Sequence, residues 1–77
     1  MITSDQIRAA RSMLRWTGKE LAEESGIGFS TLMRLETESG VPKAQAKTLE
    51  AIRKAFEKAG IEFIGTPDNG AGVKWRN

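Results

Sequence analysis

The chain has 77 residues, of which 29% are charged, and a formal net charge of +2 at neutral pH. This length suits one compact domain, with or without a short appendage, and is too small for a large enclosed active site. Cysteine and histidine are both absent. The composition therefore excludes disulfides, zinc-finger ligand sets, thiol nucleophiles and the usual neutral-pH general base. We expect no enzyme, no bound metal and no cofactor.

The N-terminal residues contain neither a basic segment nor an apolar run, so the pattern of a signal peptide is missing. No apolar stretch reaches the length of a membrane span. We therefore expect a cytoplasmic protein that does not enter a membrane. The net charge is too small to indicate a nucleic-acid partner, which must be inferred from motifs instead.

The first predicted helix begins near Ser4 and ends near Arg15. Thr3 and Gln6 have the spacing of a capping box, in which each side chain bonds the other residue's backbone N–H. Apolar residues then recur at intervals of three and four, which is the spacing of one helical face.

The second and third helices are predicted over residues 18–25 and 29–36. Thr17 and Glu20 form another capping box, and Gly26 suits the left-handed conformation that ends many helices. So few residues separate the two helices that they cannot lie antiparallel comfortably. They are expected to cross at a steep angle, as in a helix-turn-helix.

Residues 37–43 contain glycine and proline and predict a loop, after which a fourth helix continues to Gly60. Residues 61–64 and 73–76 predict two short strands around a glycine-rich turn. Two strands alone are marginally stable in water, so the hairpin either packs on the helices or pairs with another chain. We expect an all-α bundle of about four to five helices at residues 1–60, and a β extension at 61–77 that serves in dimerisation.

In the third predicted helix, Leu32 and Leu35 face inward. The opposite, outer face carries both polar and apolar side chains. Serine and arginine on that face can hydrogen-bond to bases, and phenylalanine and methionine can contact thymine methyl groups. The N-terminus of the second helix presents backbone N–H groups that suit a phosphate. The candidate DNA-contacting residues are Thr17, Gly18, Lys19, Gly28, Phe29, Ser30, Thr31, Met33, Arg34 and Lys43.

Two opposite charges lie on apolar helix faces, Arg11 on the first helix and Glu36 on the third. Burying either charge alone is costly, so we expect a mutual ion pair with a structural role. The rival interpretation, a catalytic carboxylate with an arginine electrophile, lacks any base or nucleophile.

Five parts of the sequence form a recognisable pattern: Arg11, the Trp-Thr-Gly-Lys-Glu-Leu-Ala segment at 16–22, Gly-Ile-Gly at 26–28, Thr31-Leu32 and Leu35-Glu36. Together they resemble the Cro/CI-type, or XRE-like, helix-turn-helix family. The resemblance runs from about residue 7 to residue 59. It implies an all-helical domain that binds operator DNA, usually as a dimer, and acts as a transcriptional regulator, here more readily as a repressor than as an activator.

The sequence departs from the family pattern on its contact surface. Gly18 stands where the family often has a DNA-contacting glutamine, Gly28 where a serine or threonine caps the third helix, and Phe29 where a polar residue often contacts bases. Two other functions are left open. In the first, the chain is a protein-interaction module, such as an antitoxin or adaptor, in which the hairpin or the fourth helix binds a partner and DNA binding is secondary or absent; the apolar Phe29, Met33 and Trp75 favour it. An RNA binder is the third class, although an aromatic-studded sheet and a GxxG clamp are both missing.

Overall fold

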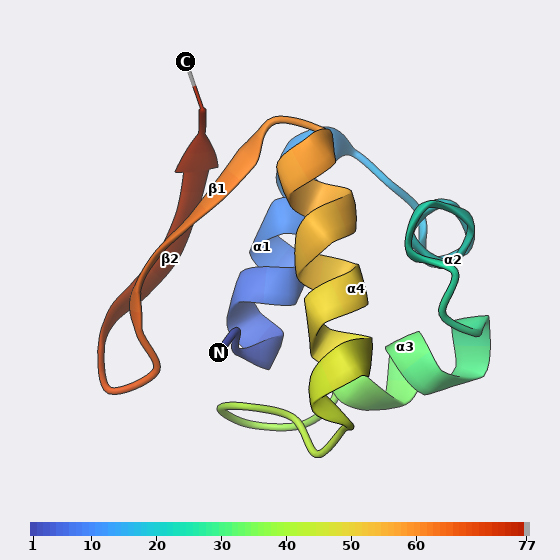
Figure 1. The fold of residues 1–77 in the computed structure, drawn as a ribbon, viewed down its shortest axis with the longest axis horizontal. Coiled ribbons are helices and arrows are strands. Elements are labelled where there is room, and N and C mark those ends of the chain that lie inside the picture. Colours follow the sequence, from blue (N-terminus) through green and yellow to red (C-terminus); the bar gives the residue numbers. More distant parts are fainter. Residues whose placement is uncertain (77) are drawn as a thin grey trace.

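A computed structural model describes residues 1–76. The chain forms four helices followed by a two-stranded antiparallel sheet (Figure 1). The elements are α1 (Ser4–Leu14), α2 (Gly18–Ser25), α3 (Phe29–Glu36), α4 (Ala46–Lys58), β1 (Ile61–Thr66) and β2 (Asn69–Trp75). Residue 77, the last of the predicted β extension, lies outside the described residues.

Local signals set the ends of the first three helices. Both predicted capping boxes are confirmed: Thr3 and Gln6 exchange hydrogen bonds of 2.8 and 3.1 Å at the start of α1, and Thr17 and Glu20 do so at the start of α2. Gly26 ends α2 in the left-handed conformation, with φ at 74°. The α2 and α3 helices have the predicted bounds. The α1 helix ends at Leu14, one residue before the predicted end, and its C-cap residue Arg15 also has the left-handed conformation.

The core lies where all four helices and β1 meet. Its fully buried apolar side chains are Ile7, Ala10, Leu21, Leu32, Leu35, Ile52, Phe56 and Ile61. The ring of Phe56 from α4 stacks on Trp16 with a centroid distance of 5.6 Å, and it meets Phe63 of β1 at 6.0 Å. This aromatic row joins the segment before α2 to α4 and to the sheet.

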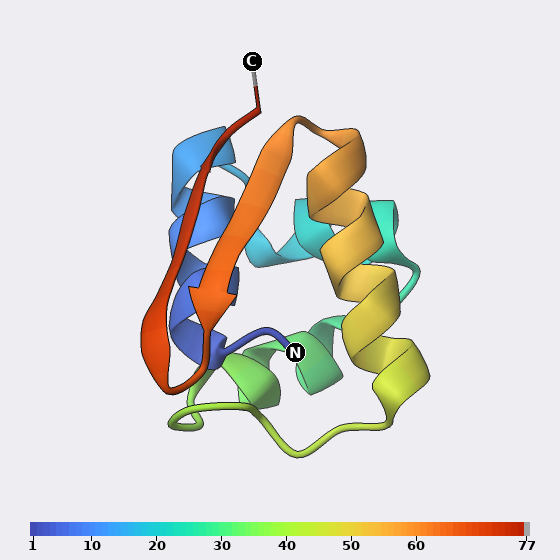
Figure 2. The same ribbon diagram turned by 60° about the vertical axis from the view of Figure 1, so that its left-hand side comes forward.

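The prediction of an all-α fold class is wrong, because the C-terminal strands belong to the body of the domain. β1 and β2 pair with Ile61 opposite Trp75 and Phe63 opposite Val73. Ile61 is fully buried, and Phe63 and Val73 pack against the core. The hairpin lies alongside α1 and α4 (Figure 2). The fold is therefore a helical bundle with a two-stranded sheet packed on it, and the strands pair within one chain.

Both strands are longer than the sequence predicted, since the glycine-rich turn continues the pairing. The register shifts between Ile64 and Thr66, which leaves Gly65 as an irregularity in the strand. Gly65 has a φ of 75°, and a Cβ at this position would collide with the backbone carbonyl of Gly70. The turn itself thus shortens to Pro67 and Asp68.

The hairpin is fastened to α1 by one buried side chain, Gln6. Its Nε2 donates to the carbonyl of Ile64 at 3.2 Å and to that of Gly72 at 2.9 Å. Its Oε1 accepts the Thr3 N–H of the capping box. The sequence indicated only the capping role, because nothing local reveals a partner so distant along the chain.

Candidate nucleic-acid interface

The α2 and α3 helices are joined by a turn of three residues, and they cross steeply. Figure 1 shows α2 end-on while α3 runs across the view. Ser25 stabilises the turn: its hydroxyl donates to the carbonyl of Leu21 at 2.7 Å and accepts the N–H of Ile27 at 3.2 Å. Ile27 packs against the core. The two helices are therefore held at a defined angle by contacts on both sides of the turn.

The C-terminal end of α3 is anchored to α1. Ser4 donates its hydroxyl to the carbonyl of Leu35 at 2.7 Å, and Arg8 donates to the carbonyl of Glu36. The Glu36 carboxylate accepts two hydrogen bonds from Arg11, whose third nitrogen reaches the carbonyl of Trp16 at 3.1 Å. Anchoring this end leaves the first turn of α3 on the surface.

Phe29, Ser30 and Arg34 are exposed along α3, whereas Thr31 is half-buried. Phe29 retains 45% of its accessible surface, a large fraction for an aromatic side chain. Gly28 is the N-cap of α3 and, lacking a side chain, provides no capping hydrogen bond. The first turn of α3 thus presents one aromatic ring, one hydroxyl and uncapped backbone N–H groups to the outside.

An apolar cluster joins α3 to the start of α2. The position that a Cβ on Gly18 would occupy lies 2.7 Å from Met33 Cε and 2.8 Å from Phe29 Cε1. Both side chains therefore rest on the first turn of α2, in space that only glycine leaves open. We call Gly18, Phe29 and Met33 the apolar cluster. All three were predicted contact residues, but their mutual contact depends on how α2 and α3 meet and was not predicted.

The start of α2 offers a limited set of backbone donors. The amides of Thr17 and Glu20 are used in the capping box. The amides of Gly18 and Lys19 lie in the first turn, where helix geometry provides no carbonyl partner. The Glu20 carboxylate is also close to this end. The amides of Gly18 and Lys19 and the exposed Lys19 side chain are thus the groups of α2 that an anion can reach.

A polar cluster connects Arg34 to the loop after α3. Glu38 accepts a hydrogen bond from Arg34 Nη1 at 2.8 Å on one carboxylate oxygen and the Lys43 N–H at 2.7 Å on the other. Arg34 also approaches the carbonyl of Lys43 at 3.4 Å. We call Arg34, Glu38 and Lys43 the polar cluster. It brings together two predicted contact residues, and its central member, Glu38, was not among the predicted ones.

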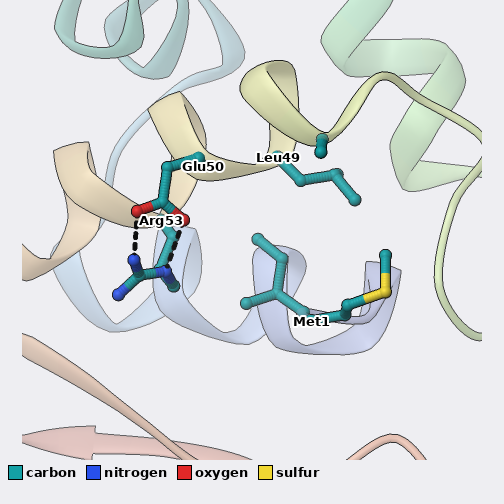
Figure 3. A pocket seen from close by; sticks show the side chains of 6 residues that line it. Met1, Leu49, Glu50 and Arg53 are labelled. Carbon is teal, nitrogen blue, oxygen red and sulfur yellow. Dashed lines mark hydrogen bonds and ion pairs between the residues drawn. The ribbon is translucent and has the colours of Figure 1, made fainter.

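A shallow pocket lies elsewhere, between the N-terminus and α4 (Figure 3). Met1, Ile2 and Leu49 form its apolar side. Its charged groups are already paired, because Arg53 donates to Glu50, and this hydrogen bond lowers the pKa of the Glu50 carboxyl. The pocket contains none of the predicted contact residues, so we place the candidate site on α2 and α3.

Two further findings concern residues 1–76 as a whole. No helix in this part of the chain combines the length and the apolar character needed to cross a membrane. Within the same residues, acidic side chains do not gather in any group of three or more that could hold a metal ion.

No protein-family model matches the chain, and the search of curated proteins found no significant match. The likeness to XRE-type proteins thus depends only on the residues quoted above, and the function must be argued from the site.

Proposed function

We propose that this protein binds duplex DNA sequence-specifically, as a transcriptional regulator that inserts α3 into the major groove. In this proposal α2 and α3 form a helix-turn-helix. The observation that carries it is the exposed first turn of α3, beside the Gly18 and Lys19 amides of α2, which the capping box leaves free. In a helix-turn-helix complex the first turn of the second helix reaches the base edges, while the first helix crosses the DNA backbone.

The contact residues have separable roles. Ser30 and Arg34 donate hydrogen bonds to base edges, and the planar guanidinium of Arg34 can pair with guanine through two of them. The amides of Gly18 and Lys19 meet a phosphate at the positive end of α2. Lys19 and Lys43 neutralise phosphates, Thr17 caps the start of α2, and Gly28 and Thr31 complete the DNA-contacting surface at the start of α3.

The proposal extends to assembly and to the biological effect. Two copies bind as a homodimer and read two half-sites about one helical turn apart. Occupying a promoter needs neither an effector pocket nor an activation surface, so we propose repression. The same proposal includes a cytoplasmic location and no catalytic activity.

One observation favours a second function, that of a protein-interaction module such as an antitoxin or adaptor. The apolar cluster exposes Phe29 on the surface assigned here to DNA. Aromatic side chains of this kind are frequent anchors in protein–protein interfaces. Under this alternative, a partner protein would cover α3, and binding to DNA would be weak or absent.

A salt titration separates the two functions. Binding of the full chain to random-sequence duplex DNA is measured by fluorescence anisotropy over a range of salt concentrations. Each phosphate contact contributes a slope of about 0.9 in log affinity against log salt. We expect a steep slope that decreases by roughly one contact in Lys19→Ala and in Lys43→Ala. Lys58→Ala, at the end of α4, is the control and keeps the slope. Absence of binding at low salt would contradict the proposed function.

A further inference from the structure

The side chains of the apolar cluster cannot read bases by donating hydrogen bonds, so the cluster needs another explanation. Phe29 and Met33 are one helical turn apart on α3, so they lie on the same face. Both press on the first turn of α2, at the bare backbone of Gly18. Met33 is partly buried by this contact, while Phe29 keeps 45% of its surface exposed. The result is an apolar contact area of fixed position at the start of α3.

The surroundings of this area indicate what it meets. Lys19 and Ser30 are exposed beside it, and the Gly18 and Lys19 amides at the start of α2 take no part in the capping-box hydrogen bonds. An apolar protein surface would bury these donors unpaired, which is costly. The major groove provides acceptors on base edges and phosphates for them. It also offers one apolar group, the methyl on C5 of thymine, which 5-methylcytosine shares.

We propose that Phe29 and Met33 form a receptor for the C5-methyl group of a pyrimidine in the major groove. This inference rests on the proposed DNA-binding function and specifies what it reads. Because Gly18 has no side chain, α2 leaves room for both apolar residues and has no polar side chain of its own at that point. Methyl recognition by α3 takes the place of base recognition from the start of α2.

The test begins with duplexes selected by the full chain from a random-sequence pool. Each thymine of the selected site is replaced in turn by uracil, which removes only the methyl group. Burial of one methyl predicts that affinity falls about fourfold at one position of each half-site, and about 15-fold when both half-sites are changed. In a second arm, cytosine and 5-methylcytosine are compared at the same position. Tighter binding of the 5-methylcytosine duplex than of the cytosine duplex shows that the methyl group is read, whereas equal affinity for the two would count against methyl recognition.

Variants connect the effect to the cluster. In Phe29→Ala, thymine and uracil duplexes should bind equally, whereas Ile64→Ala, which removes a comparably exposed apolar side chain from the hairpin, should keep the discrimination. Circular dichroism checks that both variants are folded. Gly18→Ala gives a second test, because its Cβ displaces Met33 Cε and Phe29 Cε1 and should weaken the discrimination without removing either side chain.

The possible outcomes distinguish methyl recognition from DNA binding as such. Tight binding that is insensitive to uracil at every position would overturn methyl recognition and leave the DNA-binding function intact. Failure to bind any duplex, with or without thymine, would overturn both. Discrimination that persists in Phe29→Ala would exclude the apolar cluster as the receptor.

Discussion

Glu36 of α3 and Arg11 of α1 form a paired ion bridge in which Arg11 Nη2 and Nε donate to the two carboxylate oxygens at 2.8 and 2.9 Å. Only 7% of the Glu36 side chain is exposed, against 28% for Arg11. The hydrogen bond with Glu36 raises the pKa of Arg11 above its ordinary value. This bridge sets the position of α3 relative to α1.

The two partners should be energetically coupled. Glu36→Ala leaves the Arg11 guanidinium partly buried and unpaired, and we expect a loss of about 3 kcal/mol in the free energy of unfolding. Replacing both residues by apolar ones, Arg11→Met with Glu36→Leu, should recover most of that loss, because no charge is then left without a partner. Urea denaturation of the single and double variants measures the coupling. A double variant no more stable than Glu36→Ala would show that the charges do not act as a pair.

Gln6 should be a stabilising link between the hairpin and the helices. Gln6→Ala removes the donor to the carbonyls of Ile64 and Gly72 and the acceptor of the Thr3 cap, and it should destabilise the fold by about 2–3 kcal/mol. Gln6→Glu keeps the cap acceptor but places a carboxylate against two carbonyls, so it should be at least as destabilising. Hydrogen exchange of the hairpin amides follows the effect residue by residue. Unchanged protection of the β1 and β2 amides from hydrogen exchange in both variants would show that Gln6 does not stabilise the hairpin.

Gly28 offers a stabilising substitution. A Cβ at this position meets nothing within 4 Å, and the residue has φ at −60° and ψ at 143°, which other residues adopt readily. Gly28→Ser adds a capping hydroxyl to α3 and reduces the freedom of the unfolded chain, so we expect a gain of about 0.5–1 kcal/mol. Thermal unfolding measures it, with Gly28→Ala as the control that lacks the hydroxyl. Equal stability of the serine and alanine variants would mean that no cap forms.

The sequence was informative where the determinants are local. Capping boxes act over three residues, and the glycine at the end of α2 acts on its own backbone, so the starts and ends of the helices could be predicted. Contacts far apart along the chain could not. Gln6 bonds to residues 58 and 66 positions away, and no spacing rule connects them.

The all-α prediction failed for a related reason. Both strands were predicted, but as an extension of an all-helical domain, because nothing local to them reveals the burial of Ile61 or the hydrogen bonds from the Gln6 amide. On the candidate site, residue types identified Phe29, Met33 and Arg34, but not their neighbours. The contact of Gly18 with two side chains, and the bond from Arg34 to Glu38, depend on how α2, α3 and the following loop meet.

Glu38 should restrain DNA binding by occupying Arg34. The hydrogen bond to Glu38 holds Arg34 Nη1 toward the loop after α3, and the Glu38 charge itself repels phosphates. Removing an exposed ion pair of this kind with Glu38→Gln should raise affinity for duplex DNA by up to about fivefold. Asp68→Asn in the hairpin turn makes the same change in net charge away from α3 and is the control. A gain of equal size in both variants would assign the effect to net charge rather than to Arg34.

Competition binding distinguishes sequence-specific readout by α3 from a general attraction to duplex DNA. The affinity of the full chain for a duplex selected from a random pool is compared with that for a scrambled duplex of the same composition, at fixed salt. We expect the selected duplex to bind about 1,000-fold more tightly or better, and Arg34→Ala to remove roughly 10-fold or more of that preference. Equal affinity for the two duplexes, or a preference unchanged in Arg34→Ala and Ser30→Ala, would contradict it.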